Sequence, residues 1–480
     1  MIEVVRLLTN PVLIKSPAPR DHASGLGFGN GRSPITILGG GPAGLAVAFY
    51  ANRAGIPFVL FERSAELGGL CRTFKSGAHS YDSGAHRFHD RDPEITADLR
   101  RIMGSELVSV DAPSRIYDDG RFIDFPPTPL DVIFSGIRLR EAVSIGFDVL
   151  RSRYRKRPIR SFADMAVAQF GATLARRILL NYSEKLWGLP ADRLSPDVAT
   201  RRLQGMSLTS LLVELFLPSR RTSHIDGTFL YPIQGYGRIV ERLQETLPSG
   251  SLRTGYEVQG LDCERGRIRR IRFNGAPAFE PAGRIVSTLP LTVLAGFLGN
   301  ELSATALAAA RELRFRQIRL FFIRLKRAQV SPNASIYIPD HKFCISRLYE
   351  PKNRSKAMAP EDETSLVAEA PCFEGDSVHS MTAEDLANRV IGELSELGII
   401  NRDEVIEWRH HMLRNAYPVY SLDYGRAVEV IRKDIAEIGN LDLIGRGGLF
   451  VYTHLHDQMR FGKDYVKELA EAQPAGVTAA

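Results

Sequence analysis

The stretch from Ile35 to Glu62, ITILGGGPAGLAVAFYANRAGIPFVLFE, constrains the fold more than any other part of the chain. It joins a short β-rich run, a glycine-rich turn, an alanine-rich segment, a stop at Gly55 and a second apolar run over 58–61. The glycines of the turn have the spacing G-x-G-x-x-G, and an acidic residue ends the second run. Strand, glycine turn, helix, strand and acid in this order predict a βαβ unit that binds a dinucleotide.

Each residue of this fingerprint has a physical role. Gly39 permits a tight turn after the first strand, Gly41 lets the backbone approach a pyrophosphate, and Gly44 lets the helix pack close to the strand. The helix N-terminus adds N–H groups and partial positive charge. We expect Glu62 to accept hydrogen bonds from ribose hydroxyls. The flanking strand, helix and acid disfavour the alternative interpretation, a glycine turn without a ligand.

The size and composition of the chain indicate a globular protein of two structural parts. At 480 residues the chain exceeds the size at which one core keeps growing. A hydrophobic fraction of 44% and a charged fraction of 24% are ordinary for a folded body. The chain has no run of about 18 apolar residues and no signal-peptide pattern, so we expect neither a membrane span nor secretion by that route.

Cysteine usage and net charge narrow the cofactors and partners. Four widely spaced cysteines form no CxxC pair, which argues against zinc, an iron-sulfur cluster or a redox dithiol and fits a reducing cytoplasm. The formal net charge of +7 favours anionic partners. Nucleic acid is disfavoured among them, because no zinc-finger, RNP or basic-zipper pattern accompanies the arginines.

The predicted cofactor domain is discontinuous. Residues 1–34 are rich in Pro, Gly and Ser and are expected to form a flexible extension. From Asp90 to about Ser219 we expect mainly helices, and around 264–266 a hairpin turn between two strands. These patterns assign the cofactor domain to 35–95, 221–300 and 421–480, and a second, substrate or cap domain to 96–220 and 301–420.

Several separated pieces of sequence, taken together, resemble a known family. They are GGLCRTF from Gly68, GAHRFH from Gly84, NYSEKLWGLP from Asn181, YPIQGYGRIVERL from Tyr231, SRLYEPKN from Ser346 and GRGGLFVYTHLHD from Gly445. In this order they resemble the FAD-dependent amine-oxidase superfamily, and within it the branch of protoporphyrinogen-oxidase-like proteins and UDP-galactopyranose mutases. The resemblance implies an α/β fold in which a Rossmann-like FAD-binding domain of three layers (ββα) carries an inserted α+β substrate domain.

The resemblance also implies roles for individual residues. His86, and with less support His89, is placed beside the isoalloxazine, and Trp187 near the substrate. Catalytic roles are expected for His86, Trp187 and Arg446. The expected FAD contacts are Gly39, Gly41, Gly44, Glu62, Gly69, Arg72, His86, Val258, Gly445, Arg446 and Asp457. The expected substrate contacts are Arg347, on a diphosphate, and Tyr417, Tyr420 and Tyr452.

Several of these residues have alternative interpretations. His86 and His89 also fit surface histidines, Arg347 also fits an ion pair with an acid such as Glu350, and the tyrosines also fit core aromatics. Paired histidines at 410–411 and at 454 and 456 have no third ligand at useful spacing, so no metal site is predicted. A basic amphipathic stretch over 130–160 fits either peripheral contact with anionic membrane or packing on the domain.

Two departures from the mutases affect the expected reaction. Met206 stands where the mutases carry a second arginine after the tryptophan motif, and residues 454–457, HLHD, replace their usual polar segment. The leading hypothesis is therefore a FAD-dependent oxidoreductase acting on a sugar nucleotide or other phosphorylated sugar-like substrate, in cell-surface glycan or secondary-metabolite biosynthesis. The alternatives are a redox-neutral mutase that uses reduced FAD, and a non-catalytic FAD-binding scaffold. The expected partner is an anionic small molecule carrying a diphosphate, whereas the oligomeric state is not predicted.

Overall fold

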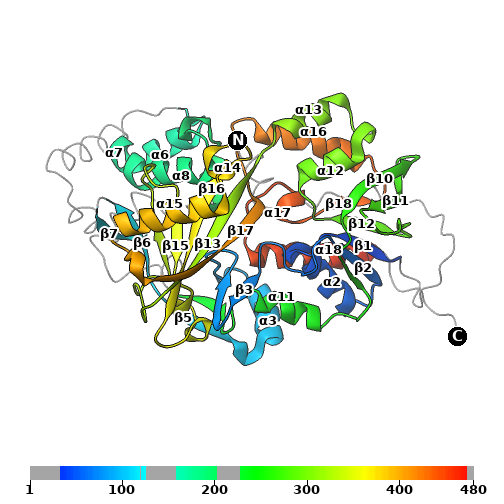
Figure 1. Cartoon of the computed structure of the whole chain (residues 1–480). Helices are drawn as coiled ribbons and strands as arrows, with labels where there is room; N and C mark the ends of the chain where they lie inside the picture. The colour runs from blue at the N-terminus through cyan, green and yellow to red at the C-terminus, as the bar shows by residue number, and fades with distance from the viewer. Residues whose placement is uncertain (1–32, 119, 126–157, 203–227, 473–480) are drawn as a thin grey trace.

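The computed structural model describes residues 33–118, 120–125, 158–202 and 228–472 (Figure 1). Most of the predicted extension over 1–34, nearly all of the basic stretch over 130–160, and Met206 lie outside the described residues. None of the helices in the described part of the chain is long and apolar enough to cross a membrane.

The first of two large sheets is built around the predicted βαβ unit. Its five strands are all parallel, in the order β18 (Leu441–Leu443), β12 (Arg284–Ser287), β1 (Ile35–Leu38), β2 (Phe58–Glu62) and β9 (Leu252–Thr254). Helix α2 (Pro42–Arg53) connects β1 to β2. It begins with Gly41 as N-cap and proline at its first turn, and the chain then turns at Gly55, whose φ is +67°. The βαβ prediction is confirmed.

Helices and a hairpin cover this sheet. Helix α18 (Leu455–Ala472) packs against α2, and the contact is so close that a Cβ added at Gly462 would lie 2.7 Å from Ala46. The hairpin of β10 (Val258–Glu264) and β11 (Arg267–Phe273) lies against the sheet, where the rings of Phe61 and Phe273 are 4.7 Å apart. The result is the expected Rossmann-like domain with a helix layer, a parallel sheet and a small antiparallel layer.

The second sheet has seven strands (Figure 1). Their order is β17 (Val405–Pro418), β13 (Phe315–Leu325), β16 (Thr364–Cys372), β15 (Arg347–Tyr349), β14 (Ser335–Tyr337), β6 (Ser114–Asp118) and β7 (Arg121–Phe125). All neighbours are antiparallel except β14 and β6. Helix α15 (Ala383–Glu396) packs on this sheet through Leu386, Val390 and Leu394. A second buried cluster lies on the same sheet. It includes Tyr81, which belongs to the hairpin of β3 (Thr73–Ser76) and β4 (His79–Asp82).

The structure differs from two of the sequence-based expectations. After helix α3 (Pro93–Met103) the chain forms β5 (Leu107–Asp111), β6 and β7, where mainly helical structure was expected. Strand β5 pairs with β8 (Thr228–Pro232), and β6 extends the second sheet. In addition, α13 (Ala304–Glu312), which the sequence assigned to the substrate domain, packs on α16 (Tyr424–Ala436) and on α12 (Leu291–Leu298). It therefore groups with the first sheet, and the second sheet resumes at Phe315.

Candidate active site

A cavity of about 680 Å³ lies between the two sheets. The residues that directly follow β1, β2 and β12, namely Gly39, Arg63 and Thr288, all line it. The carboxyl ends of parallel strands meet at one edge of a sheet, which is where dinucleotides bind in this type of fold. From the second sheet, β6, β14, β15, β16, β13 and β17 each contribute lining residues (Ser114, Tyr337, Arg347, Glu369, Ile318 and Tyr417).

The glycine turn has the geometry that its sequence predicts. Gly39 has a φ of +104°, and a Cβ added there would lie 2.2 Å from Thr288 Oγ1. At Gly44 a Cβ would lie 2.0 Å from the carbonyl oxygen of Gly39, so the helix can approach the strand only because this residue is glycine. Gly41 lines the cavity, and a Cβ added to it would meet nothing within 4 Å. The backbone at Gly41 is thus open to a ligand.

Glu62 and Gly69 support the same turn. The Glu62 carboxylate lines the cavity and accepts hydrogen bonds from Gly40 N and Ser64 N, both at 2.8 Å. Gly69 has a φ of +53°, and a Cβ on it would lie 3.2 Å from Gly41 Cα. The second glycine pair therefore makes the close backbone approach that its position suggests. Val258, at the start of β10, also lines the cavity.

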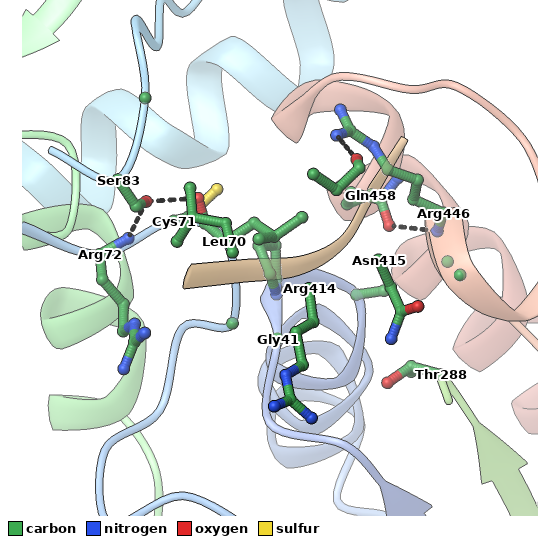
Figure 2. A pocket seen from close by; sticks show the side chains of 18 of the residues that line it. Gly41, Leu70, Cys71, Arg72, Ser83, Thr288, Arg414, Asn415, Arg446 and Gln458 are labelled. Carbon is green, nitrogen blue, oxygen red and sulfur yellow. Dashed lines mark hydrogen bonds between the residues drawn. The ribbon is translucent and has the colours of Figure 1, made fainter. Parts of the chain in front are cut away.

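Arg72 lines the cavity beside these glycines. Its backbone N–H donates to Ser83 Oγ over 3.2 Å (Figure 2). The Nε atom of its side chain is buried and has no hydrogen-bond partner within the described structure. A buried guanidinium N–H without an acceptor is costly, so a ligand oxygen at this position would satisfy it.

The GAHRFH loop brings His86 and His89 to the cavity. His86 is half-buried and stacks on Tyr236 with 4.9 Å between ring centroids. Burial, reinforced by the positive charges of Arg347 and Arg446, lowers the pKa of His86 to about 3. Burial and two neighbouring arginines likewise lower the pKa of His89 to about 4. Both rings are therefore neutral at physiological pH.

The hydrogen bonds around Ser83 assign the tautomer of His86. Ser83 Oγ donates its proton to the carbonyl oxygen of Leu70 over 2.7 Å, so it can only accept from His86 Nε2, 3.3 Å away. Nε2 then carries the ring proton, and Nδ1 is the atom able to accept one.

Arg347 lines the cavity but is already paired. Its Nε and Nη2 donate to both carboxylate oxygens of Glu369 at distances of 2.7–3.0 Å, and the Glu369 side chain is only 2% exposed. The acid suggested by the sequence, Glu350, instead accepts hydrogen bonds from Val330 N and Ser331 N. The ion-pair interpretation of Arg347 was thus correct in kind, with a different partner.

Of the predicted aromatic contacts, two reach the cavity and two do not. Tyr417 and Tyr452 line it and stack with centroids 5.8 Å apart. Trp187 and Tyr420 are nearly fully buried behind them: Trp187 stacks on Tyr420 at 5.6 Å and meets the rings of Tyr417 and Tyr452 edge-on. Neither lines the cavity formed by the described residues, because the partly buried Tyr417 and Tyr452 cover them. Their positions give support to the tyrosines rather than contact with a substrate.

The residues of the last motif, GRGGLFVYTHLHD, differ in whether they line the cavity. Gly445 and Arg446 line it, and Arg446 Nε donates to Thr453 O over 3.1 Å while its backbone N–H donates to Gln458 Oε1 (Figure 2). Asp457, predicted as a cofactor contact, does not line the cavity as described. Its carboxylate accepts the backbone N–H of His454 over 2.7 Å and so caps helix α18.

The structure adds cavity residues that the sequence did not single out. They include Arg87, Arg91, Cys71, Thr288, Arg414 and Asn415. Thr288 had a usable signal, since it follows a predicted strand of a parallel sheet, and Arg87 lies inside the GAHRFH motif itself. No sequence signal pointed to Arg414, because its strand belongs to the other domain. Among the described residues, no His, Cys, Asp and Glu side chains group in a way that would hold a metal ion.

Comparison with known proteins agrees with this geometry. Residues 42–445 match the model of the flavin-containing amine oxidoreductases. Coproporphyrinogen III oxidase of Bacillus subtilis (strain 168) is 19% identical over 438 residues, covering 85% of this chain and 92% of that protein. A local match to the putative oxidoreductase YgfK of Escherichia coli, 49% identical over 41 residues, covers 8% of this chain and only 4% of YgfK.

Solved structures share the fold over nearly the whole chain. A reduced UDP-galactopyranose mutase superposes with a TM-score of 0.80 at 19% identity, covering 92% of this chain and 94% of that one. A putative protoporphyrinogen oxidase from Exiguobacterium sp. 255-15 superposes with a TM-score of 0.73, also at 19% identity, covering 93% of this chain and 100% of that one.

Proposed function

Since this chain belongs to the family of flavin-containing amine oxidoreductases, we propose that it is an oxidoreductase that removes a hydride from an anionic, phosphorylated sugar-like substrate, above all a sugar nucleotide. FAD is the cofactor of the protein. The choice of substrate rests on the concentration of positive charge around Arg87 and Arg91, where the GAHRFH loop meets the second sheet.

The described residues fit FAD. The open backbone at Gly41 and the N-terminus of α2 suit a pyrophosphate, the Glu62 carboxylate suits ribose hydroxyls, and the buried Arg72 Nε has a proton to donate. When bound, FAD supplies the chemistry of accepting a hydride. The protein supplies binding, orientation and the movement of a proton.

Arginines give the far part of the cavity a positive potential. Arg87 and Arg91 line it, and Arg87 donates to the hydroxyls of Ser114 and Ser335. Besides burial, the charges of these two arginines lower the pKa of His89, and the charges of Arg446 and Arg91 lower the pKa of His454 well below its ordinary value. Arg347 adds a guanidinium whose charge is compensated by Glu369. Such a surface attracts phosphate oxygens, for which the arginine fork provides paired donors.

His86 is the proposed base. Oxidation of a hydroxyl-bearing carbon removes a hydride from carbon and a proton from oxygen, so an acceptor for the proton is required. Neutral His86 has an unprotonated Nδ1 because its Nε2 proton is held by Ser83 Oγ. We assign the substrate proton to that nitrogen.

An anaerobic absorbance experiment tests the proposal. The purified yellow protein is mixed with UDP-, GDP- and dTDP-sugars, and the oxidised flavin band is followed over time. We expect one member of the panel to bleach the band, and Arg91→Met to slow the bleaching at limiting substrate. Arg269→Met, which removes an equal charge from the exposed face of β11 outside the cavity, is the matched control. Equal slowing in both variants would argue against binding of the anion by Arg91.

A second candidate is a redox-neutral sugar-ring mutase acting with reduced FAD. The mutase with a TM-score of 0.80 and the GAHRFH loop at the cavity favour it. The same sugar panel is therefore repeated after dithionite reduction, with product analysis. An isomer formed without net bleaching would support the mutase, whereas neither bleaching nor an isomer would contradict both proposals for sugar nucleotides.

A further inference from the structure

Strand β17 leaves the ladder where it passes the cavity. It pairs with β13 up to Leu413, opposite Ile318, and resumes at Tyr417, opposite Arg316. Three residues of β17, 414–416, therefore stand against one residue of β13. Asn415, in the middle, has a φ of +52°, a left-handed conformation that asparagine tolerates and most residues avoid. Bulges of this kind re-aim side chains beside functional sites.

The bulge delivers two side chains to the cavity. Arg414 and Asn415 line it together with Gly39 and Gly41 of the cofactor turn. Figure 2 shows the Arg414 side chain pointing from the strand toward the turn at Gly41. Arg414 is exposed and, among the described residues, makes no hydrogen bond or ion pair, whereas Arg347 of the same sheet is fully paired with Glu369. Its guanidinium is thus available to a ligand.

The position of the bulge is tied to the cofactor domain. Arg446, which lies in the turn after β18, donates from Nη1 to the carbonyl oxygen of Ala416 over 3.2 Å. This bond fixes residue 416 relative to Gly445, which itself packs against the start of α2: a Cβ added at Gly445 would lie 2.7 Å from Ala43 Cβ. Arg414 is held at a defined place across from the glycine turn.

We propose that Arg414 binds the diphosphate of FAD from the substrate-domain side, so that the first sheet and the second sheet both bind the cofactor. A diphosphate carries about two negative charges, while a helix N-terminus offers roughly half a positive charge. The planar guanidinium supplies the remaining charge and two parallel donors. The glycine fingerprint accounts for one side of the diphosphate, and Arg414 accounts for the other.

Release of FAD from the intact holoprotein tests this. After dilution, the rise of free-flavin fluorescence gives the release rate. Because a charge-assisted hydrogen bond contributes about 1.5–3 kcal/mol, we expect Arg414→Gln to release FAD roughly 10- to 100-fold faster than the wild type. Arg414→Lys, which keeps the charge without the fork, should lie between them. Arg269→Gln is the charge-matched control and should release FAD at the wild-type rate.

A second pair of variants tests the bulge without removing the arginine. Asn415→Gly keeps access to positive φ and should leave the release rate within about 3-fold of wild type. Asn415→Val disfavours that conformation and should accelerate release while the melting temperature of the apoprotein stays close to that of the wild type. Wild-type release in Arg414→Gln, or equal acceleration in Arg269→Gln, would overturn the proposal. These outcomes are independent of which substrate the enzyme oxidises.

Discussion

At the scale of single residues, the cavity combines groups held in fixed states with groups left open. His86 is kept neutral by burial and by nearby arginines, and Ser83 fixes which ring nitrogen is protonated. Glu62 is fixed by two backbone N–H groups that hold its carboxylate at the glycine turn. Replacing His86 is therefore expected to affect the chemistry, and replacing Glu62 is expected to affect cofactor binding.

His86→Ala should reduce turnover far more than FAD content. Loss of a general base typically costs about 10²- to 10⁴-fold in kcat, and His86 makes no contact that shapes the glycine turn. Turnover per bound flavin and the flavin-to-protein absorbance ratio measure the two effects separately. Tyr236→Phe is the control, because it keeps the ring that stacks on His86 and removes only a hydroxyl that donates to Arg87 O. Lost FAD with unchanged turnover per flavin would refute the assignment.

Glu62→Ala should weaken FAD retention. The substitution removes a ribose acceptor and frees the N–H groups of Gly40 and Ser64 that hold the turn. We expect flavin to be lost on dialysis, whereas Glu62→Gln, which keeps one acceptor oxygen, should retain more. Full occupancy of the alanine variant after dialysis would count against this role.

At the scale of elements, different glycines of the turn serve packing and ligand binding. Gly44 is needed because helix α2 approaches β1 too closely for a side chain, whereas Gly41 faces open space. The sequence predicted this division. It did not predict the strands over 107–125, because the helix expected from the polar, charged run over 90–106 was extended beyond Met103. Asp119-Gly120, which stands between alternating residues, is nevertheless a hairpin signal.

Gly44→Ala and Gly41→Ala should therefore fail in different ways. A Cβ at residue 44 would lie 2.0 Å from Gly39 O, so we expect the apoprotein to lose on the order of 1–3 kcal/mol of stability. A Cβ at residue 41 meets no protein atom within 4 Å, so Gly41→Ala should melt like the wild type and yet bind FAD weakly. Thermal melts of both apoproteins, followed by FAD titration, make the comparison. Equal melting temperatures for both variants would contradict it.

At the scale of the whole molecule, one cavity joins two sheets whose strands come from separated parts of the chain. The first sheet uses residues from 35 to 62, 252 to 287 and 441 to 443, and the second uses residues from 114 to 125 and 315 to 418. Several half-buried histidines between or beside these sheets have a lowered pKa, among them His410, whose Nε2 accepts a hydrogen bond from Arg319 Nε over 3.0 Å.

Stability should fall as the pH drops from 7 to 5. Burial lowers the pKa of His86 to about 3 and that of His89 and His410 to about 4, while unfolded histidine titrates near 6.5. Between these values the unfolded state binds more protons, so protonation favours unfolding. Paired carboxylates lose their contribution only below about pH 4.5, outside this window.

His410→Gln isolates one part of this pH dependence. Glutamine keeps an acceptor for Arg319 but does not titrate, so the difference in unfolding free energy between pH 7 and pH 5 should shrink, on the order of 1 kcal/mol for this half-buried site. Buried Asp82, whose raised pKa acts in the opposite direction, is unchanged in the comparison. Denaturant unfolding at the two pH values provides the measurement, and an unaltered difference would refute the contribution of His410.

The parts of this protein that depend on local spacing could be predicted from the amino-acid sequence. They are the βαβ unit, the different roles of Gly39, Gly41 and Gly44, the hairpin at 264–266 and the motifs that place His86 and Arg446 at the cavity. Three other features became visible only in the folded protein: Glu369 neutralises Arg347, Tyr417 and Tyr452 cover Trp187 and Tyr420, and Arg414 points at the glycine turn. Those contacts join residues far apart in the chain. Their geometry depends on strand register, on a bulge and on the packing of one sheet against another, none of which is encoded in a short run of residues.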